Sequence, residues 1–287
     1  MRALDARGAA ARIGTCALLD VRDEREFMAG HLEGSGHLPA AELTDRRGEL
    51  PPRDAEILVV AAAAAHAREA AEALEGLGYQ HVEWLDGALS ESDQDRLVRT
   101  PAIPLWRPSP FLEQVLERLP DPSEGRRRVL DLAAGAGRES VFMALRGYDV
   151  EAWDHDRGAL EKASAMARRH GVTIETQTRD LEIRDPRLPV ESHDVVMVFR
   201  FLHRPLFPQI ARAVAPGGVV MYETYLRGQE RFGRPKHPRF LLDRDELPKH
   251  FPGFLVEHYE EQTPESGPML ARLLARKPAS SAAPSAP

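Results

Sequence analysis

The chain alternates short, largely apolar runs with stretches in which apolar residues recur at helical spacing. The runs are residues 18–21, 57–60, 129–132, 195–199 and 219–222. Each has the length of a strand and is rich in Val and Leu. One helical stripe starts near Arg68 and ends at Gly76 or Gly78, and another covers residues 138–148. This alternation predicts an α/β fold with parallel sheets covered by helices.

The stretch 90–108 interrupts this alternation. It holds three prolines and a run of acidic residues, and it has neither helical nor strand periodicity. We therefore predict two α/β domains, residues 1–97 and 108–277, joined by a linker at 98–107. The last residues, 278–287, are small and rich in Pro, which predicts a disordered tail.

Composition narrows the classes of function. The 287 residues are 43% hydrophobic and 29% charged, which is typical of a globular protein. Residues 1–100 hold 11 Lys and Arg against 19 Asp and Glu, so this part repels nucleic acid, and the remainder is near neutral. No signal-peptide pattern opens the chain, and no apolar run approaches the roughly 20 residues of a membrane span. We expect a cytoplasmic protein without a membrane partner. The one cysteine, Cys16, excludes an intrachain disulfide, and no zinc-type spacing indicates a metal.

The first domain carries a recognisable set of residues. Residues 18–30 are expected to form a strand and then a helix that begins with acidic residues. The set consists of Asp20, Arg22, Glu26, Phe27, Gly30, His31, Gly34, Pro39, Asp86 and Gly87. These residues resemble a rhodanese-like domain, and the resemblance spans almost all of residues 10–95.

That resemblance implies a sulfur-carrying cysteine after the strand 57–60, in a cradle of backbone N–H groups at a helix start. The position holds Ala61, followed by Ala62–Ala65 and His66. Alanine cannot carry sulfur, and Cys16 lies one strand away, where we interpret it as a small buried hydrophobe. His66 is interpreted as a helix N-terminal residue, with an anion ligand as the alternative. We predict an inactive domain kept for docking, dimerisation or stabilising its neighbour, so a second copy of the chain and another protein are the candidate partners.

The second domain has the strongest chemical signal. A strand ending at Leu132 is followed by the small-residue turn 133–137, which lets backbone approach a ligand, and then by a helix. The next strand ends at Asp154, where a carboxylate can accept hydrogen bonds from a ribose diol. The dinucleotide pattern G-x-G-x-x-G is not met. Asp131 would repel a pyrophosphate and attract a cationic sulfonium, which indicates S-adenosylmethionine (SAM) and not NAD.

The third, fourth and fifth predicted strands follow in the order that a SAM-binding domain requires. A third strand is expected to end at Asp180–Leu181, and a Pro-Gly-Gly turn leads to the fifth strand. Together these elements resemble class I SAM-dependent methyltransferases over about 170 residues. The segments "VLDLAAGAGRES", "GYDVEAWDHD", "RDLEI" and "MLARLLARKP" resemble the tellurite-resistance methyltransferase branch and its small-molecule relatives. That branch implies a soft sulfur-, selenium- or tellurium-type acceptor.

The resemblance also implies a role for each matching residue. The methionine end of SAM is expected to contact Asp131, Ala133, Gly135 and Gly137. Asp154 is expected to bind the ribose hydroxyls, with His155 beside the adenine, Asp180 at the adenine amine and Leu181 at its ring. Phe199 and Arg200 are expected to flank the methyl group. Taken singly, each carboxylate has the alternative role of a helix cap or an ion-pair partner.

The residues that would act on the methyl acceptor are less clearly indicated by the sequence. His203, at the edge of the fourth strand, is the first candidate for a general base, and Tyr225, just after the fifth strand, is the second. Both have packing roles as alternatives. A basic loop holds Arg227, Arg231, Arg234, Lys236 and Arg239, which could bind an anionic substrate or simply be solvated. Trp106 is a candidate cover for the cofactor, with packing as the alternative.

Three functions follow from these features. The leading one is a SAM-dependent methyltransferase that acts on a small molecule. The second is methylation of rRNA or tRNA through the basic loop, although "FRFL" stands where an exocyclic amino methyltransferase would carry Asn/Asp-Pro-Pro-Tyr/Phe. The third is a non-enzymatic SAM-binding regulatory module. A sulfurtransferase is the weakest alternative, because Ala61 offers no thiol.

Overall fold

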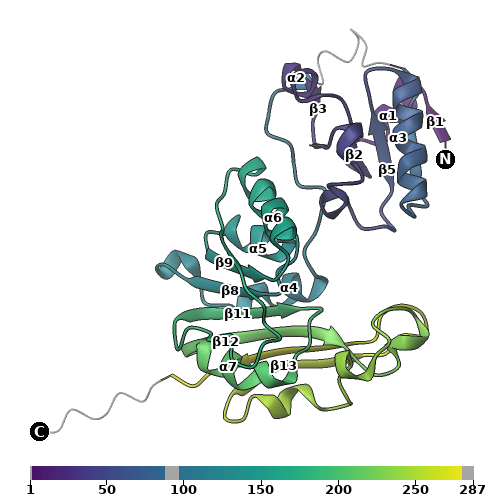
Figure 1. The fold of residues 1–287 in the computed structure, drawn as a ribbon. Coiled ribbons are helices and arrows are strands. Elements are labelled where there is room, and N and C mark those ends of the chain that lie inside the picture. The colour runs from purple at the N-terminus through teal and green to yellow at the C-terminus, as the bar shows by residue number, and fades with distance from the viewer. Residues whose placement is uncertain (1, 88–96, 280–287) are drawn as a thin grey trace, which may run out of the picture. The chain divides into compact units, whose positions relative to one another are not determined.

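The computed structural model describes residues 2–87 and 97–279, and the chain divides into two units, Met1–Arg107 and Pro108–Pro287. Figure 1 shows the fold coloured from the N-terminus to the C-terminus. The predicted disordered tail lies, from residue 280 onward, outside the described residues. Val98, which we assigned to the linker, belongs to a short strand, β7 (Leu97–Val98).

The first unit contains a parallel sheet with the strand order β1-β6-β5-β2-β4. Its strands are β1 (Arg2–Leu4), β2 (Ala17–Asp20), β4 (Ser35–His37), β5 (Ile57–Val60) and β6 (Val82–Leu85). Its helices are α1 (Ala6–Ala10), α2 (Glu24–Ala29) and α3 (Ala64–Gly76), and β3 (His31–Leu32) pairs antiparallel with β7. Strand β5 is apolar throughout because both of its faces are covered. Ile57 and Val59 contribute to one core cluster, and Leu58 and Val60 to another.

The start of α3 corrects the sequence prediction. The helix begins at Ala64, four residues before Arg68, so Ala64 and Ala65 belong to its first turn, while residues 61–63 form the loop. Alanine has the highest helix propensity, so a helix can begin within this run. The amphipathic pattern becomes visible only later, because the buried residues of the helix begin at Ala67. Periodicity therefore placed the start too late.

The second unit is built on a seven-stranded sheet with the order β10-β9-β8-β11-β12-β14-β13. Its strands are β8 (Arg128–Leu132), β9 (Asp149–Asp154), β10 (Glu175–Thr178), β11 (His193–Phe199), β12 (Val214–Tyr225), β13 (Leu255–Gln262) and β14 (Leu270–Arg276). Strands β8 to β12 are parallel, and β14 and β13 are antiparallel additions. Its helices are α4 (Pro110–Val115), α5 (Arg138–Ala144), α6 (Arg157–Arg169) and α7 (Phe207–Ala213).

Helices cover both faces of this sheet, with α5 and α6 on one side and α7 on the other (Figure 1). On the α7 face, Phe207 and Ile210 pack in a core cluster with alternate residues of β8, β11 and β12, including Leu132, Val198 and Tyr222. On the opposite face Asp131 of β8 contacts Ser140 of α5, and Glu223 of β12 contacts Ser109, the N-cap residue of α4. The odd-numbered residues of these strands, Asp131 among them, therefore lie on the face that α5 covers.

The strand order creates a switch point at the carboxyl ends of β8 and β11. From β8 the chain adds β9 and β10 on one side and then returns to add β11 and β12 on the other. Loops that leave neighbouring strands in opposite directions form the crevice where open α/β sheets bind ligands. Among the described residues, no helix is both long enough and apolar enough to span a membrane.

Two strand ends differ from the sequence prediction. Strand β10 ends at Thr178, so Asp180 and Leu181 lie in the following loop and not at the strand end. Strand β12 extends to Tyr225, so this tyrosine is the last residue of the strand and not a loop residue. In both cases the backbone pairing sets the boundary: β10 pairs with β9 only as far as Asp154, whereas β12 pairs with β14 as far as Leu270.

Candidate functional site

The loop after β8 has an unusual backbone. Ala133, Gly135 and Gly137 all have positive φ, at 60°, 54° and 75°. A Cβ on Gly137 would lie 2.4 Å from the Cβ of Ala163, so only glycine fits there. A Cβ on Gly135 would meet no atom within 4 Å, so that position is open to an approaching ligand. The small residues that we noted in the sequence thus have different roles, close packing at Gly137 and open access at Gly135.

Asp154 joins this loop to the next one. One carboxylate oxygen, Oδ2, accepts the Gly135 amide at 2.8 Å, and Oδ1 accepts the Asp156 amide at 2.8 Å. His155 Nδ1 lies 3.2 Å from Oδ1, and its side chain is 81% exposed. A carboxylate oxygen has two lone pairs, so Asp154 retains acceptor capacity for two hydroxyl groups. This geometry fits the predicted ribose contact.

Asp131 is buried at the end of β8. Its side chain is 2% exposed, and Oδ2 accepts the Ser140 hydroxyl at 2.5 Å. Burial raises the pKa of Asp131 to about 8, and the negative charges of Glu139 and Asp154 add to this effect, while the Ser140 hydrogen bond opposes it. No cationic side chain pairs with Asp131 among the described residues. A buried carboxyl that lacks a cation fits a site for the sulfonium of SAM.

Asp180 and Leu181, the residues predicted to contact the adenine, lie in a loop that starts close to Asp154. The backbone amide of Arg179 donates to the Asp154 carbonyl at 2.8 Å, so the loop that holds Asp180 starts beside Asp154. Asp180 itself is exposed, and its Oδ1 accepts the Glu182 amide at 2.9 Å. Leu181 is buried in the core cluster on the α7 face. The adenine roles of both residues stay predictions.

The most highly connected polar residue near these strand ends, Glu223 of β12, was not among the sequence candidates. Its side chain is fully buried, and Oε1 lies 3.1 Å from Arg200 Nη2 and accepts the Ser109 hydroxyl at 3.1 Å. Its Oε2 accepts Arg272 Nε at 2.7 Å. Strand register places Phe199, Glu223 and Arg272 side by side across three strands. One signal was visible, a carboxylate inside the otherwise apolar strand "VVMYETY".

Arg200 and Tyr225 meet at the same edge. Arg200 follows Phe199, the last residue of β11, and has a φ of 61°. Its guanidinium carbon lies 5.0 Å from the centre of the Tyr225 ring. His203 lies farther along the chain, at the start of a 3₁₀ turn (Arg204–Leu206), and not at the strand edge that we expected. The structure thus brings together Arg200 and Tyr225, while within the described part of the chain no hydrogen bond or ion pair joins His203 to them.

The predicted basic loop is partly neutralised. Arg227 forms an ion pair with Asp243, and Arg239 lies 3.2 Å from Glu182. Arg231 Nε donates to the Gly228 carbonyl at 3.3 Å, and the Gln229 side chain donates through Nε2 to the Arg234 carbonyl at 3.3 Å. Exposed ion pairs are weak, but they lower the net charge that an anion would meet. Trp106, the predicted cover, is buried and belongs to the first unit.

The first unit places Ala61 and Cys16 at opposite edges of its sheet. Ala61 follows β5 and is 2% exposed, whereas Cys16 precedes β2, and these two strands are parallel and in register. Burial raises the pKa of the Cys16 thiol, whose sulfur lies 3.3 Å from the Arg12 carbonyl. The cysteine therefore cannot replace a nucleophile at Ala61. His66 lies exposed within the first turn of α3.

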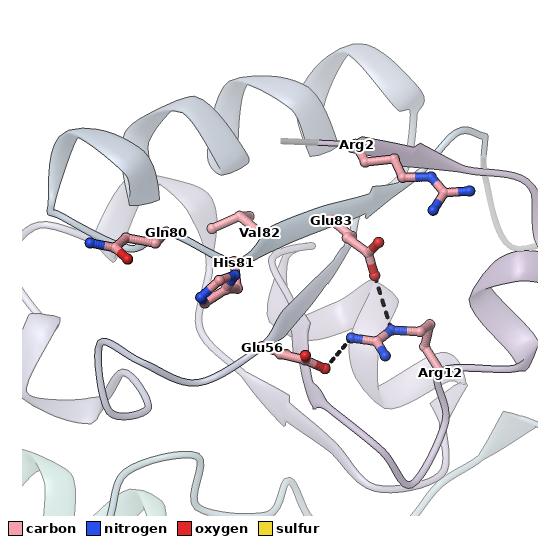
Figure 2. Close-up of a pocket in the computed structure, with 7 residues that line it drawn as sticks. All are labelled: Arg2, Arg12, Glu56, Gln80, His81, Val82 and Glu83. Carbon is pink, nitrogen blue, oxygen red and sulfur yellow. Dashed lines mark hydrogen bonds and ion pairs between the residues drawn. The ribbon is translucent and has the colours of Figure 1, made fainter.

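A pocket of about 220 Å³ lies in the same unit (Figure 2). It is lined by Arg2, Arg12, Glu56, Gln80, His81, Val82 and Glu83. Arg12 spans it, with ion pairs to Glu56 at 2.5 Å and to Glu83 at 2.9 Å. Glu56 directly precedes β5, so the pocket opens at the amino edge of the sheet, away from Ala61. It contains none of the residues that we predicted for a functional site.

Two family models match the chain in sequence order. Residues 5–94 match the model described as "Rhodanese-like domain", and residues 123–264 match "Tellurite resistance protein TehB". A Haemophilus influenzae protein named "Probable S-adenosyl-L-methionine-dependent methyltransferase TehB" is 32% identical over 88 residues, which is 30% of this chain and 30% of the relative. The matched stretch is thus less than a third of the length of that relative.

Two further similarities cover more of the chain. "Uncharacterized protein UNK4.09" from Schizosaccharomyces pombe is 23% identical over 293 residues, covering 81% of this chain and 84% of that protein. The matched part of this chain is longer than either of its two units, so the similarity extends into both. The crystal structure of TehB from Haemophilus influenzae has 20% identity and a TM-score of 0.48, and the match covers 67% of this chain and 68% of that one.

The matches confirm both resemblances drawn from the sequence, and with them the predicted α/β fold class. S-adenosylmethionine is accordingly the cofactor that the second unit implies, as its buried unpaired carboxyl already indicated. The chain therefore joins a rhodanese-like domain to a class I SAM-dependent methyltransferase domain similar to TehB.

Proposed function

We propose that this chain is an enzyme that transfers the methyl group of SAM to a small molecule at the carboxyl ends of β8, β11 and β12. The observation that supports this most strongly is the environment of Asp131, a buried carboxyl with no cationic side chain paired to it among the described residues. A bound sulfonium would supply the missing opposite charge. The open, left-handed loop from Ala133 to Gly137 lies directly beside it in the chain.

The residues of the chain have mainly positioning roles in this proposal. SAM supplies a methyl group that is already activated for attack. Asp154 would orient the ribose through its remaining lone pairs, with His155 beside the adenine, and Phe199 would border the methyl group from the end of β11. The site needs to hold an acceptor atom in line, near 3 Å from the methyl carbon, and to exclude water.

The acceptor in this proposal is a soft sulfur-, selenium- or tellurium-type group or an anionic group on a small molecule. Tyr225 and His203 are the candidate bases if the accepting atom carries a proton. The ion pairs of Arg227 and Arg239 argue against the basic loop as a platform for RNA. A small acceptor is therefore favoured over rRNA or tRNA.

The test is transfer of label from methyl-labelled SAM into a cell extract that is then separated into RNA, protein and small-molecule fractions. We expect label in the small-molecule fraction. Label in RNA would instead support the alternative that we disfavour. Binding of SAM without label in any fraction would contradict an enzyme and support a SAM-binding regulatory module.

A matched pair of variants links this activity to the predicted cofactor site. Asp154→Asn removes the charge that accepts the Gly135 amide, and we expect it to weaken SAM binding about tenfold or more. Asp156→Asn makes the same exchange two residues later, where the side chain caps α6 through the Gly158 and Ala159 amides. Asparagine caps a helix as well as aspartate does, so this control should bind SAM normally. Equal affinities in the two variants would remove Asp154 from the site.

A further inference from the structure

Arg200 has a backbone conformation that arginine seldom adopts. Its φ of 61° lies in the left-handed region, directly after β11 ends at Phe199. Such conformations persist only where the surroundings enforce them, and they are concentrated at ligand sites. The enforcing contact here is the Arg200 amide, which donates to the backbone carbonyl of Glu223 at 2.7 Å.

The Glu223 side chain restrains the Arg200 guanidinium as well. Both of its carboxylate oxygens are engaged, Oε1 with Ser109 and Arg200, and Oε2 with Arg272. A fully buried carboxylate cannot leave such partners without leaving charges unpaired, so its position is fixed. Glu223 therefore holds one end of Arg200 at the edge of the sheet.

Part of Arg200 remains available to a ligand. The side chain is 36% exposed, and the ion pair with Glu223 uses only Nη2. Among the described residues, Nε and Nη1 have no hydrogen-bond partner, and neither does the hydroxyl of Tyr225, whose ring lies 5.0 Å from the guanidinium carbon. These donors project from the ends of two adjacent strands.

The charges of the cluster favour an added anion. Two arginines, Arg200 and Arg272, share the carboxylate of Glu223. Glu260 lies farther from Arg272, at 3.6 Å, and is itself 40% exposed. Burial raises the pKa of Glu139, which accepts the Ser109 amide, and so disfavours its charged form. Arg200 and Arg272 thus share one close carboxylate, that of Glu223, and Glu260 offsets the second positive charge only from 3.6 Å.

We propose that the methyl acceptor carries a carboxylate or another small oxyanion that Arg200 and Tyr225 bind, with Glu223 as the residue that positions Arg200. This inference rests on the proposed methyl transfer at the same edge of the sheet. A guanidinium binds a carboxylate or oxyanion through two parallel N–H donors, which fixes orientation as well as position. The anion would then anchor the acceptor beside the loop that begins at Ala133.

The test uses the full chain, methyl-labelled SAM and a small-molecule extract separated into anionic and neutral compounds. We expect the labelled product among the anionic compounds. Arg200→Gly should lower the transfer of label about tenfold or more, because it removes a charged donor pair. Glycine adopts a φ of 61° without strain, so the variant should fold, and added guanidinium chloride should restore part of the activity. SAM affinity, measured by calorimetry, should change less than about threefold, which corresponds to under 1 kcal/mol.

Two more variants separate ligand binding from structure. Arg187→Gly makes the same exchange at another left-handed arginine, with φ 54° and a side chain that is 89% exposed, and it should transfer label normally. Glu223→Gln keeps the shape and removes the charge. It should raise the amount of anionic fraction needed for half-maximal rate more than it lowers the maximal rate.

The outcomes distinguish this inference from the proposed function. Label in neutral compounds, or normal transfer by Arg200→Gly, would overturn the anionic acceptor and leave methyl transfer intact. A large loss of SAM affinity in Arg200→Gly would also overturn it, because Arg200 would then belong to the cofactor site. Absence of label in every fraction, with SAM bound, would overturn both proposals.

Discussion

Two strand-to-helix loops of this chain are built only from small residues and differ in their surroundings. Residues 61–63, all alanine, join β5 to α3 in the first unit, and residues 133–137, alanine and glycine, join β8 to α5 in the second. Beside the first loop, the buried carboxylate of Asp20 is paired with Arg22 at 2.6 Å. Beside the second, the buried carboxyl of Asp131 has no cationic partner among the described residues.

We interpret the first loop as complete by itself and the second as a loop that binds a ligand. A buried charge is costly unless an opposite charge meets it, so the first unit satisfies its carboxylate internally. In the second unit, burial without a cation raises the pKa of Asp131 to about 8, and we expect a bound cation to favour its charged form. Small residues alone therefore do not distinguish the two loops; the pairing of the carboxyl at the neighbouring strand end does.

The strongest test of the contrast is Asp20→Asn. Removing the carboxylate leaves the Arg22 guanidinium, which is largely buried, without its ion pair, and breaking such a pair costs about 3 to 5 kcal/mol. We expect a loss of this size in the free energy of unfolding of the first unit, measured by urea denaturation. Asp23→Asn is the control, because Asp23 caps α2 and asparagine caps equally well. Equal stability of the two variants would mean that the pair is not the stabilising element assumed here.

Gly137→Ala tests whether the second loop is held by close packing. The new Cβ would lie 2.4 Å from Ala163 and would occupy a φ of 75°, so we expect a loss of about 3 kcal/mol in stability. Gly135→Ala, with a φ of 54° and no nearby atom, should lose only about 1 kcal/mol but should still weaken SAM binding. Calorimetric titration with SAM and thermal unfolding measure both effects. If Gly135→Ala binds SAM normally, the backbone of that loop is not in contact with the cofactor.

Asp131→Asn tests the unpaired carboxyl through the pH dependence of the free energy of unfolding. The pKa of Asp131 is raised from 3.8 to about 8, so the folded state holds a proton that the unfolded state has released. Wild-type stability should therefore fall as pH rises from about 4 to about 8 and change little beyond that. Asp131→Asn should not show this component, and at pH 9 it should be more stable than wild type by about 1 to 3 kcal/mol. Urea unfolding at pH 5 and pH 9, without SAM, measures the difference. A variant less stable than wild type at pH 9 would show that Asp131 already has a compensating partner.

Ala61→Cys is expected to have the smallest effect. The position is 2% exposed, so a cysteine there should change stability by less than about 1 kcal/mol and should react slowly with a thiol reagent. Ala62→Cys, at an exposed neighbour, should react quickly. We expect neither variant to transfer sulfur from thiosulfate faster than the wild-type protein, whose one cysteine is Cys16. Turnover by Ala61→Cys alone would show that the first loop lacks only its thiol.

The local pattern of apolar and polar residues was sufficient to predict much of the fold. The apolar runs at 57–60 and 195–199 are strands because both of their faces are buried, and a continuous apolar run records that directly. The loop at 133–137 and the acid at Asp154 were likewise visible, because a small-residue turn and a strand-terminal carboxylate are short-range features. Boundaries were less accurate. The helix α3 begins at Ala64 and not near Arg68, and Tyr225 belongs to β12, since hydrogen-bond pairing and not hydropathy sets where an element begins or ends.

Residues close together in the chain were therefore enough to predict the two kinds of domain, the order of their elements and the small-residue loop after β8. Which charges meet depends instead on contacts between distant parts of the chain. Glu223 contacts Arg272 because β12 and β14 pair in that register, and it contacts Ser109 because α4 packs over the same face. Nothing in the spacing of these three residues predicts their meeting. The register between β11 and β12, which the packing of the whole sheet sets, brings the buried carboxylate of Glu223 into contact with Arg200. This contact lies at the edge of the sheet where we propose that the acceptor binds.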